Sequence, residues 1–195
     1  MERLLVATTN AGKLREIEDI LRGLPFQLLS LGDLPPVDEP VEDGSTFEEN
    51  ARLKAHGYSR TTGLPTVAED SGLEIDVLDG APGIHSARFP GATYPDKFRR
   101  LFEMMDARHA SGSTARFVCA LALVDGDRVL FETTATVEGS ITREPRGGGG
   151  FGYDPILFYP PTQCTLAELS QEDKSAVSHR GKAFRALRAH LESRR

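Results

Sequence analysis

Cysteine is scarce in this chain of 195 residues, which contains only Cys119 and Cys164. The two cysteines form no Cys-x-x-Cys pair and stand in no Cys/His cluster, so the sequence predicts neither a disulfide scaffold nor a zinc site. The amino terminus also lacks a long apolar run, because Leu4 to Ala7 is far too brief for a signal peptide core or a membrane span. We therefore expect a protein of the reducing cytoplasm with no membrane partner.

Positive charge is in short supply as well. Lysine and arginine number 23 against 29 aspartates and glutamates, which gives a formal net charge of −6. This balance argues against general binding to nucleic acid and favours a small-molecule partner. Arginines near the carboxy terminus, such as Arg185 and Arg188, leave an RNA- or DNA-binding protein as an alternative, although cations near the end of a helix are ordinary.

Hydrophobic residues make up 39% of the chain, with no compositional break, so we expect one domain over residues 1–195. Hydrophobic periodicity predicts strands at 3–8 and 26–30, helices at 14–24 and 46–60, and an amphipathic helix around 98–105. The runs 116–124 and 128–137 flank Asp125-Gly126, which is typical of a hairpin. Strand–helix units followed by a long hairpin predict a mixed sheet covered by helices.

The other predicted elements are arranged around the stretch 66–78. It contains Glu69, Asp70, Ser71 and Gly72 between two β-prone runs, and we expect two strands to meet at a tight Ser-Gly break. Adjacent carboxylates would then lie at a strand end, where α/β proteins commonly expose a ligand site, and such oxygens suit Mg²⁺. The alternative is that the two acids merely solvate a turn.

The polar loop at residues 8–13 lies between a predicted strand and helix. Asn10 is placed to cap the helix, Gly12 permits close approach, and Lys13 adds a positive charge, a combination suited to phosphate. A capped turn with a solvated lysine is the alternative. Glu42 precedes the next helix, which opens with two overlapping capping boxes, and local sequence leaves open whether it solvates the loop or reaches a metal.

Two later stretches carry rings and cations. Gly147 to Gly150 form either a flexible linker or a backbone that passes close to a ligand. Phe151, Tyr153 and Asp154 follow directly, before a strand, and offer flat rings for base stacking. The segment 171–181 leads into a final helix, and its cations at a helix start are better explained if an anion or acceptor lies there.

Five blocks of the sequence, in this order, resemble the signature blocks of the inosine triphosphate pyrophosphatase family. They are TTNAGK at 8–13, EDGSTFEENA at 42–51, EDSGL at 69–73, FGYDP at 151–155 and KSAVSHR at 174–180. Together they span nearly the whole chain, and five ordered blocks are far more specific than any one alone. Thr9 stands where the family commonly has glycine.

The resemblance implies an α/β fold with a mixed twisted central sheet, flanking helices and a nucleotide cleft between two lobes. It implies a homodimeric, Mg²⁺-dependent enzyme that hydrolyses the non-standard purine nucleoside triphosphates ITP, dITP and XTP to the monophosphate and pyrophosphate, which cleans the nucleotide pool. A non-catalytic purine nucleotide sensor, or a pyrophosphatase of other modified nucleotides, is the alternative. The sensor would not need the acids Glu42 and Asp70, which argue against it.

The resemblance also implies roles for single residues. Glu42 and Asp70 would hold Mg²⁺, and Asp70 would also accept the proton of the attacking water. The resemblance leaves open whether Glu69 binds the metal directly or orients water or a metal shell. Residues 8–13 and Lys174 would bind the phosphates, the rings would flank the purine, and Asp154 with the His-Arg pair would read its edge. The implied substrate-binding residues are Thr8, Thr9, Asn10, Ala11, Gly12, Lys13, Ser71, Phe151, Gly152, Tyr153, Asp154, Lys174, His179 and Arg180.

Overall fold

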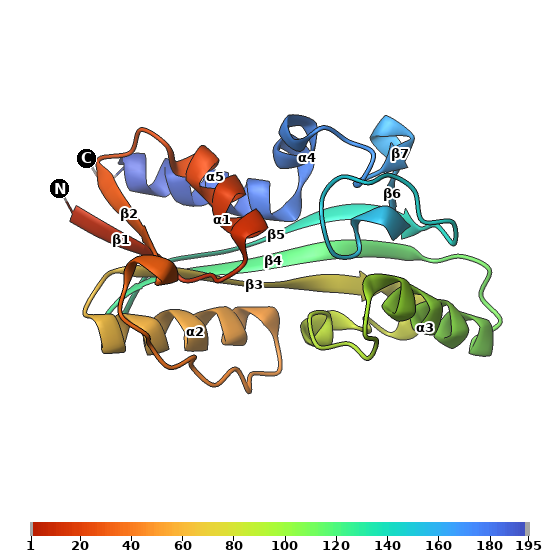
Figure 1. Cartoon of the computed structure of the whole chain (residues 1–195), viewed down its shortest axis with the longest axis horizontal. Helices are drawn as coiled ribbons and strands as arrows, with labels where there is room; N and C mark the ends of the chain where they lie inside the picture. The colour runs from red at the N-terminus through yellow and green to blue at the C-terminus, as the bar shows by residue number, and fades with distance from the viewer. Residues whose placement is uncertain (1, 194–195) are drawn as a thin grey trace. The chain divides into compact units, whose positions relative to one another are not determined.

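The computed structural model describes residues 2–193 of the chain. Within that range, strands and helices alternate in the first part, and a hairpin follows them (Figure 1). The strands are β1 (Glu2–Val6), β2 (Phe26–Ser30), β3 (Thr66–Ile75), β4 (Thr114–Asp125), β5 (Arg128–Ile141), β6 (Leu157–Tyr159) and β7 (Cys164–Thr165). The helices are α1 (Ala11–Leu21), α2 (Phe47–Thr62), α3 (Tyr94–Ala107), α4 (Gln171–Val177) and α5 (His179–Ser193).

The strands of the described chain form a 7-stranded sheet in the order β2-β1-β3-β4-β5-β6-β7. β1 runs parallel to β2, with Leu4 opposite Leu28, and parallel to β3, with Leu5 opposite Thr66. β6 is antiparallel to both β5 and β7. The sheet is therefore mixed, which confirms the predicted α/β fold class with flanking helices.

The hairpin of β4 and β5 turns where the sequence predicts. Gly126 has φ of +59°, a conformation that glycine adopts without a steric penalty, and Asp127 completes the connection. Side chains of β4 are buried from Phe117 to Val124, because both faces of this strand are covered.

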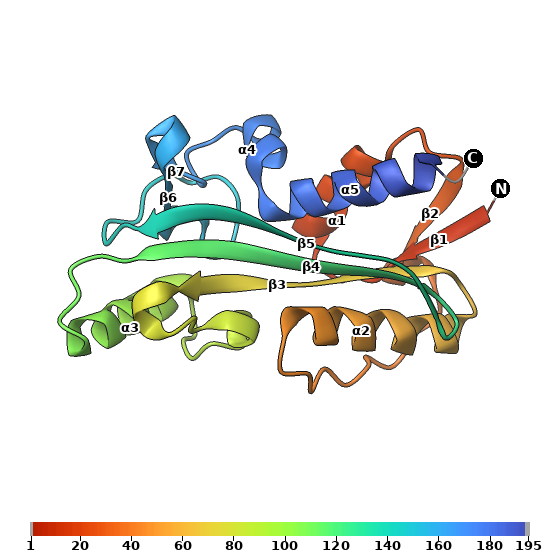
Figure 2. The same ribbon diagram turned by 180° about the vertical axis from the view of Figure 1, so that it is seen from behind.

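The chain divides into two compact units. The first unit comprises residues 2–70, 119–135 and 179–193 of the described chain, and the second comprises residues 71–118 and 136–178. In the first unit, α1 and α5 lie on one face of the strands and α2 lies on the other (Figures 1 and 2). Each unit has its own core. The first packs Leu4, Ile17, Val67, Leu121 and Phe184, among others. The second packs Leu73, Phe98, Leu101, Val137 and Ile156, among others.

The predicted break at Ser71-Gly72 is wrong, because β3 continues through it from Thr66 to Ile75. The sheet holds this segment extended, since β3 neighbours β4, whereas β1 pairs with β3 only at Thr66 and Val67. Apolar burial continues beyond the glycine as well, with Leu73 and Ile75 fully buried. The acidic pair therefore lies inside a strand rather than at its end.

The predicted final helix is present as α5, and the segment that leads into it contains a further short helix, α4. Ser170 caps α4 by accepting a hydrogen bond from the Asp173 N–H, and Ser178 then adopts an extended conformation before α5 begins. Lys174 consequently belongs to α4, whereas His179 and Arg180 are the first residues of α5.

Other predictions about organisation are not tested by this structure. A single domain over residues 1–195 and a nucleotide cleft between two lobes both stay predictions. Among the helices of residues 2–193, none combines the length and apolar character needed to cross a membrane.

Candidate functional site

Residues 8–13 cover the connection from β1 to α1 and the first turn of α1. Asn10 caps α1, as predicted, because its Oδ1 accepts hydrogen bonds from the N–H groups of Gly12 at 2.9 Å and Lys13 at 3.1 Å. Thr8 Oγ1 in turn accepts the N–H of Asn10 at 3.2 Å. These bonds give the loop a compact shape, with Thr9, Asn10 and Ala11 exposed to solvent. Its role in binding phosphate stays a prediction.

Lys13 points to the acidic stretch of β3. Its Nζ lies 2.5 Å from Glu69 Oε1, and the lysine side chain remains 23% exposed while the glutamate is only 3% exposed. The first and third sequence blocks therefore meet in the first unit. Glu69, whose role the sequence leaves open, is the direct partner of this lysine.

Glu69 also faces a second cation. Arg180 Nε lies 3.6 Å from Glu69 Oε1, and Arg180 Nη1 lies 3.2 Å from Glu16 Oε2. The side chains of Arg180 and Glu16 are each only 2% exposed. Burial alone would raise the pKa of Glu69, but the charges of Lys13 and Arg180 outweigh it and hold that pKa well below its usual value. Glu69 is therefore an ionised carboxylate inside a buried charge cluster.

Glu42 has its own lysine partner in the first unit. Lys54 Nζ lies 3.0 Å from Glu42 Oε2 and donates a hydrogen bond to the backbone oxygen of Glu69 at 3.4 Å. The Glu42 side chain is 8% exposed, so it does not merely solvate the loop. Burial alone would lower the pKa of Lys54, but the carboxylates of Glu42, Glu69 and Asp70 raise it above its usual value.

Asp70 is next to Glu69 in β3 and is held from α2. Its Oδ2 accepts a hydrogen bond from Asn50 Nδ2 at 3.2 Å. Burial raises the pKa of Asp70, and the opposing effects of the Lys54 charge and the Asn50 hydrogen bond do not cancel this rise. The positive charge of Lys54 therefore acts on both Asp70 and Glu42.

These residues fit the predicted Mg²⁺. The Lys54 ammonium lies among carboxylate and carbonyl oxygens, which shows that the position favours a cation. Such oxygens are also the hard ligands that Mg²⁺ accepts. In the part of the chain that the structure describes, no group of three or more His, Cys, Asp or Glu side chains is placed to hold a metal ion. Proteins usually hold Mg²⁺ by one or two carboxylates together with substrate phosphates, so the pair Glu42 and Asp70 is sufficient for it.

The remaining predicted residues belong to the second unit, apart from His179, which is buried at the start of α5. Lys174 Nζ lies 2.5 Å from Asp154 Oδ2, with both side chains no more than 5% exposed. The same oxygen accepts the N–H of Phe151 at 2.7 Å. Lys174 Nζ also lies 4.6 Å from the centroid of the Phe151 ring, which is 37% exposed. Ser71 is half-buried in β3.

The glycine run is a site of close backbone packing rather than a flexible linker. A Cβ on Gly150, which has φ of +68°, would overlap the Asp154 carboxylate. A Cβ on Gly147 would overlap the backbone of Ala167. Close packing therefore explains Gly147 and Gly150 without a ligand, and Gly150 lies against the Asp154–Lys174 pair.

Tyr153 is an anchor inside the second unit. It is 5% exposed, its hydroxyl donates to Ser86 O at 2.8 Å, and its ring meets that of Tyr94 edge-on at 5.3 Å between centroids. Phe151 is therefore the more accessible of the two predicted rings.

Replacing Tyr153 with phenylalanine is expected to reduce the free energy of unfolding by about 1–3 kcal/mol, because it leaves the buried Ser86 carbonyl without this donor. Urea unfolding monitored by circular dichroism measures the loss. Tyr159→Phe, at a half-buried tyrosine of β6, is the matched control and should change stability by less than about 0.5 kcal/mol. Equal losses in both variants would contradict the anchoring role.

Three residues of the first-unit cluster are not singled out by the sequence. Asn50 and Lys54 are four residues apart, so they lie on one face of α2, and Lys54 is one of only five lysines in the chain. Those two signals could have identified them. Glu16 is buried within α1, and no feature of its local sequence distinguishes it from a solvated acid.

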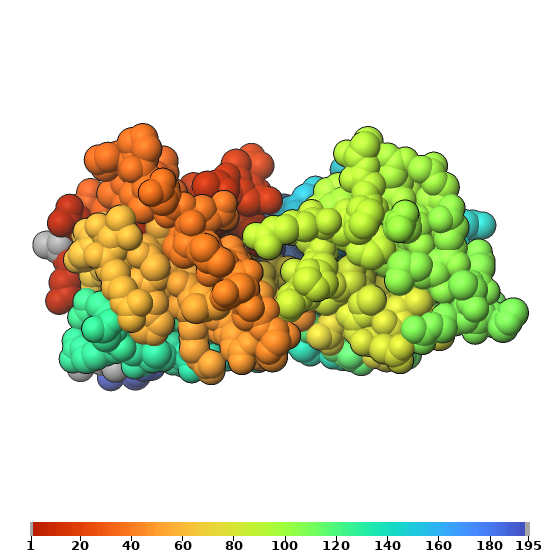
Figure 3. Space-filling model, turned by 90° about the horizontal axis from the view of Figure 1, so that it is seen from below, coloured from red at the N-terminus to blue at the C-terminus, as the bar shows by residue number. Residues whose placement is uncertain are grey.

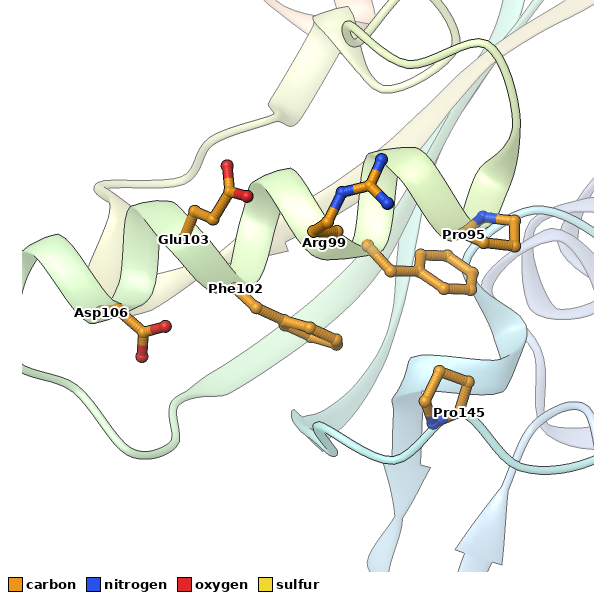
Figure 4. A pocket seen from close by; sticks show the side chains of 7 residues that line it. Pro95, Arg99, Phe102, Glu103, Asp106 and Pro145 are labelled. Atoms are coloured by element: carbon orange, nitrogen blue, oxygen red, sulfur yellow. The ribbon is translucent and has the colours of Figure 1, made fainter.

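A separate cavity of about 340 Å³ lies along α3 in the second unit. Figure 4 shows the side chains that line it, among them those of Phe102 and Pro145. None of the residues that the sequence assigned to substrate or metal lines this cavity. It is lined by Pro95, Phe98, Arg99, Phe102, Glu103, Asp106 and Pro145.

Comparison with known proteins identifies the family. The family model described as "Ham1 family" matches residues 4–190. A dITP/XTP pyrophosphatase of Geobacter sulfurreducens is 48% identical over 98% of this chain and 97% of its own length. One from Streptomyces coelicolor is 46% identical over 96% of each. The structure of a HAM1 protein from Coxiella burnetii matches with a TM-score of 0.90 and 38% identity, covering 99% of this chain and 100% of that one. The resemblance drawn from the five sequence blocks is thereby confirmed, and the chain belongs to the Ham1 family.

Proposed function

We propose that this protein hydrolyses the non-standard purine nucleoside triphosphates ITP, dITP and XTP between the α and β phosphates, releasing the monophosphate and pyrophosphate. The observation that carries this proposal is the cluster of two lysines and three acids on separate segments of the first unit: Lys13 with Glu69, and Lys54 with Glu42 and Asp70. Relatives nearly half identical to the chain carry the name dITP/XTP pyrophosphatase, which supports the same chemistry here.

Splitting this bond requires positive charge near the phosphates and a proton acceptor for the attacking water. Lys13 lies at the end of the 8–13 loop, still partly exposed, and supplies positive charge to the phosphates. Asp70, hydrogen-bonded by Asn50, accepts the proton of the water. Glu42 and Asp70 would hold Mg²⁺, which would neutralise charge on the pyrophosphate when bound.

Selection among purines depends on the edge that hypoxanthine and xanthine share. Both carry O6 and N1–H, whereas adenine carries an amino group at C6 and a bare N1, so donors and acceptors are exchanged. We assign Asp154 as the acceptor for N1–H, with the exposed ring of Phe151 stacking on the base. The donor to O6 assigned to His179 rests on the family resemblance alone. A site built on such hydrogen bonds discriminates by about 10⁴ or more, because the wrong base leaves buried polar groups unpaired.

We also propose a homodimer and a cytoplasmic location. The homodimer follows from the family resemblance. The low cysteine content agrees with a reducing compartment.

The direct test is product analysis. Purified protein incubated with ITP and MgCl₂ is expected to yield IMP and pyrophosphate, identified by ³¹P NMR, with kcat/KM for ITP well above that for ATP. Excess EDTA should abolish the reaction, and added Mg²⁺ should restore it. Release of orthophosphate from ITP, or full activity in excess chelator, would contradict the proposed function.

A further inference from the structure

We propose that Asn50 is a positioning residue that holds Glu42 and Asp70 in place relative to each other for metal binding. This inference rests on the proposed function, because it concerns the two acids assigned to Mg²⁺. Asn50 lies in the first turn of α2 and is 4% exposed. Both ends of its amide are used, and each end reaches one of the two segments that carry the acids.

One end of the amide fixes Asp70. Asn50 Nδ2 donates to Asp70 Oδ2 at 3.2 Å, which ties the carboxylate of β3 to α2. The other end accepts, since Asn50 Oδ1 receives the N–H of Gly44 at 2.9 Å. An amide offers a donor at one end and an acceptor at the other, so only one orientation of Asn50 satisfies both partners. Aspartate or alanine at this position would lose at least one of the two bonds.

The Gly44 bond matters because Glu42 lies in an irregular segment. Residues 34–46 connect the single turn Leu31–Asp33 to α2 without a helix or strand, and Figure 3 shows this orange segment against α2. Pro40 contacts α2 so closely that a Cβ on Gly57 would overlap it. Glu42 is therefore midway between two attachments to α2, one at Pro40 and one at Gly44.

These attachments leave little freedom to the Glu42 backbone. Gly44 is packed tightly as well, because a Cβ there would lie 2.7 Å from Glu49 Cβ and 2.8 Å from Asn50 Oδ1. Segments without regular structure are ordinarily the more mobile parts of a fold, so an acid on one needs such anchors to act as a ligand. Asn50 bonds Asp70 directly, and the same side chain ties Asp70 to the segment that carries Glu42.

The test compares Asn50→Ala with Ser59→Ala. Ser59 is a matched control because it is a buried polar residue of the same helix with two hydrogen bonds, to Leu64 O at 2.8 Å and from Gly126 N at 3.0 Å, and it contacts neither acid. Binding of Mn²⁺ to the folded, nucleotide-free protein is measured by electron paramagnetic resonance, and unfolding by urea gives the stability of each variant.

Asn50→Ala is expected to weaken Mn²⁺ binding by about tenfold to a hundredfold, the usual effect of removing a partner behind a ligand. It should also lower kcat for ITP more than it changes KM. Ser59→Ala should reduce stability to a similar extent and leave the Kd for Mn²⁺ unchanged. Wild-type affinity in Asn50→Ala, equal weakening in both variants, or no Mn²⁺ binding by the wild type would overturn the proposal.

Gly44→Ala tests the same contact by a change in the loop instead of in the helix. Its added methyl crowds Asn50 Oδ1, so it should weaken Mn²⁺ binding in the same direction even if Asn50→Ala does not fold. Unchanged affinity in folded Gly44→Ala would count against the positioning role. Failure of the proposed function is distinguishable, because wild-type protein would then bind Mn²⁺ without releasing pyrophosphate from ITP.

Discussion

Asp70→Asn is expected to lower kcat for ITP by about a hundredfold or more while the protein remains folded. The amide keeps the shape of the side chain and can still accept the Asn50 hydrogen bond, but it loses both the negative charge and the basicity. Steady-state kinetics with pyrophosphate detection measures the loss, and circular dichroism verifies the fold.

The matched control for this change is Asp76→Asn. Asp76 follows β3, is partly exposed, and pairs with Arg116 at 2.9 Å on the second unit. It carries no role in the proposed chemistry, so its replacement should leave kcat within about twofold of wild type, since exposed ion pairs contribute about 0–1 kcal/mol. Near-normal turnover by folded Asp70→Asn would remove Asp70 from the mechanism.

Arg180→Ala is expected to reduce the free energy of unfolding by about 3–5 kcal/mol. The substitution leaves Glu16 and Glu69 buried without the guanidinium that lies between them. Burial itself disfavours the charged guanidinium, but the neighbouring Glu69 carboxylate raises the pKa of Arg180. Arg180 is therefore charged within this buried cluster. Equilibrium unfolding in urea measures the loss of stability.

Arg185→Ala is the control, because it makes the same change at an exposed position of α5 and should cost less than about 0.5 kcal/mol. The experiment also tests the base-reading role that the family resemblance assigns to Arg180. If Arg180→Ala is stable and its kcat/KM for ITP falls much more than its kcat/KM for ATP, Arg180 recognises the purine base.

The sequence predicts local structure well wherever neighbouring residues decide it. Asn10 caps α1, Thr46 caps α2 through the Glu49 N–H, and Gly126 turns the hairpin, all as expected from patterns a few residues long. The apolar spacing from Phe98 to Met105 likewise forms the buried face of α3. These features depend on backbone geometry that the local residues set.

The partners of the charged residues, in contrast, cannot be predicted from the local sequence. Arg180 and Glu16 are 164 positions apart, and nothing near either residue predicts that they form a buried pair. The same limit explains the error at Ser71-Gly72, where small polar residues indicate a turn but β3 continues extended beside β4 in the sheet. Tertiary context overrides local preference in both cases.

The division into two units has a consequence for biosynthesis. The chain leaves the first unit after residue 70, returns for 119–135, and enters it for the last time at 179. Its core includes Ala183, Phe184, Leu187 and Leu191, which all belong to α5. A nascent chain on the ribosome therefore cannot complete this core until α5 has been synthesised, and the apolar surfaces of α1 and β1 stay open to chaperones until then.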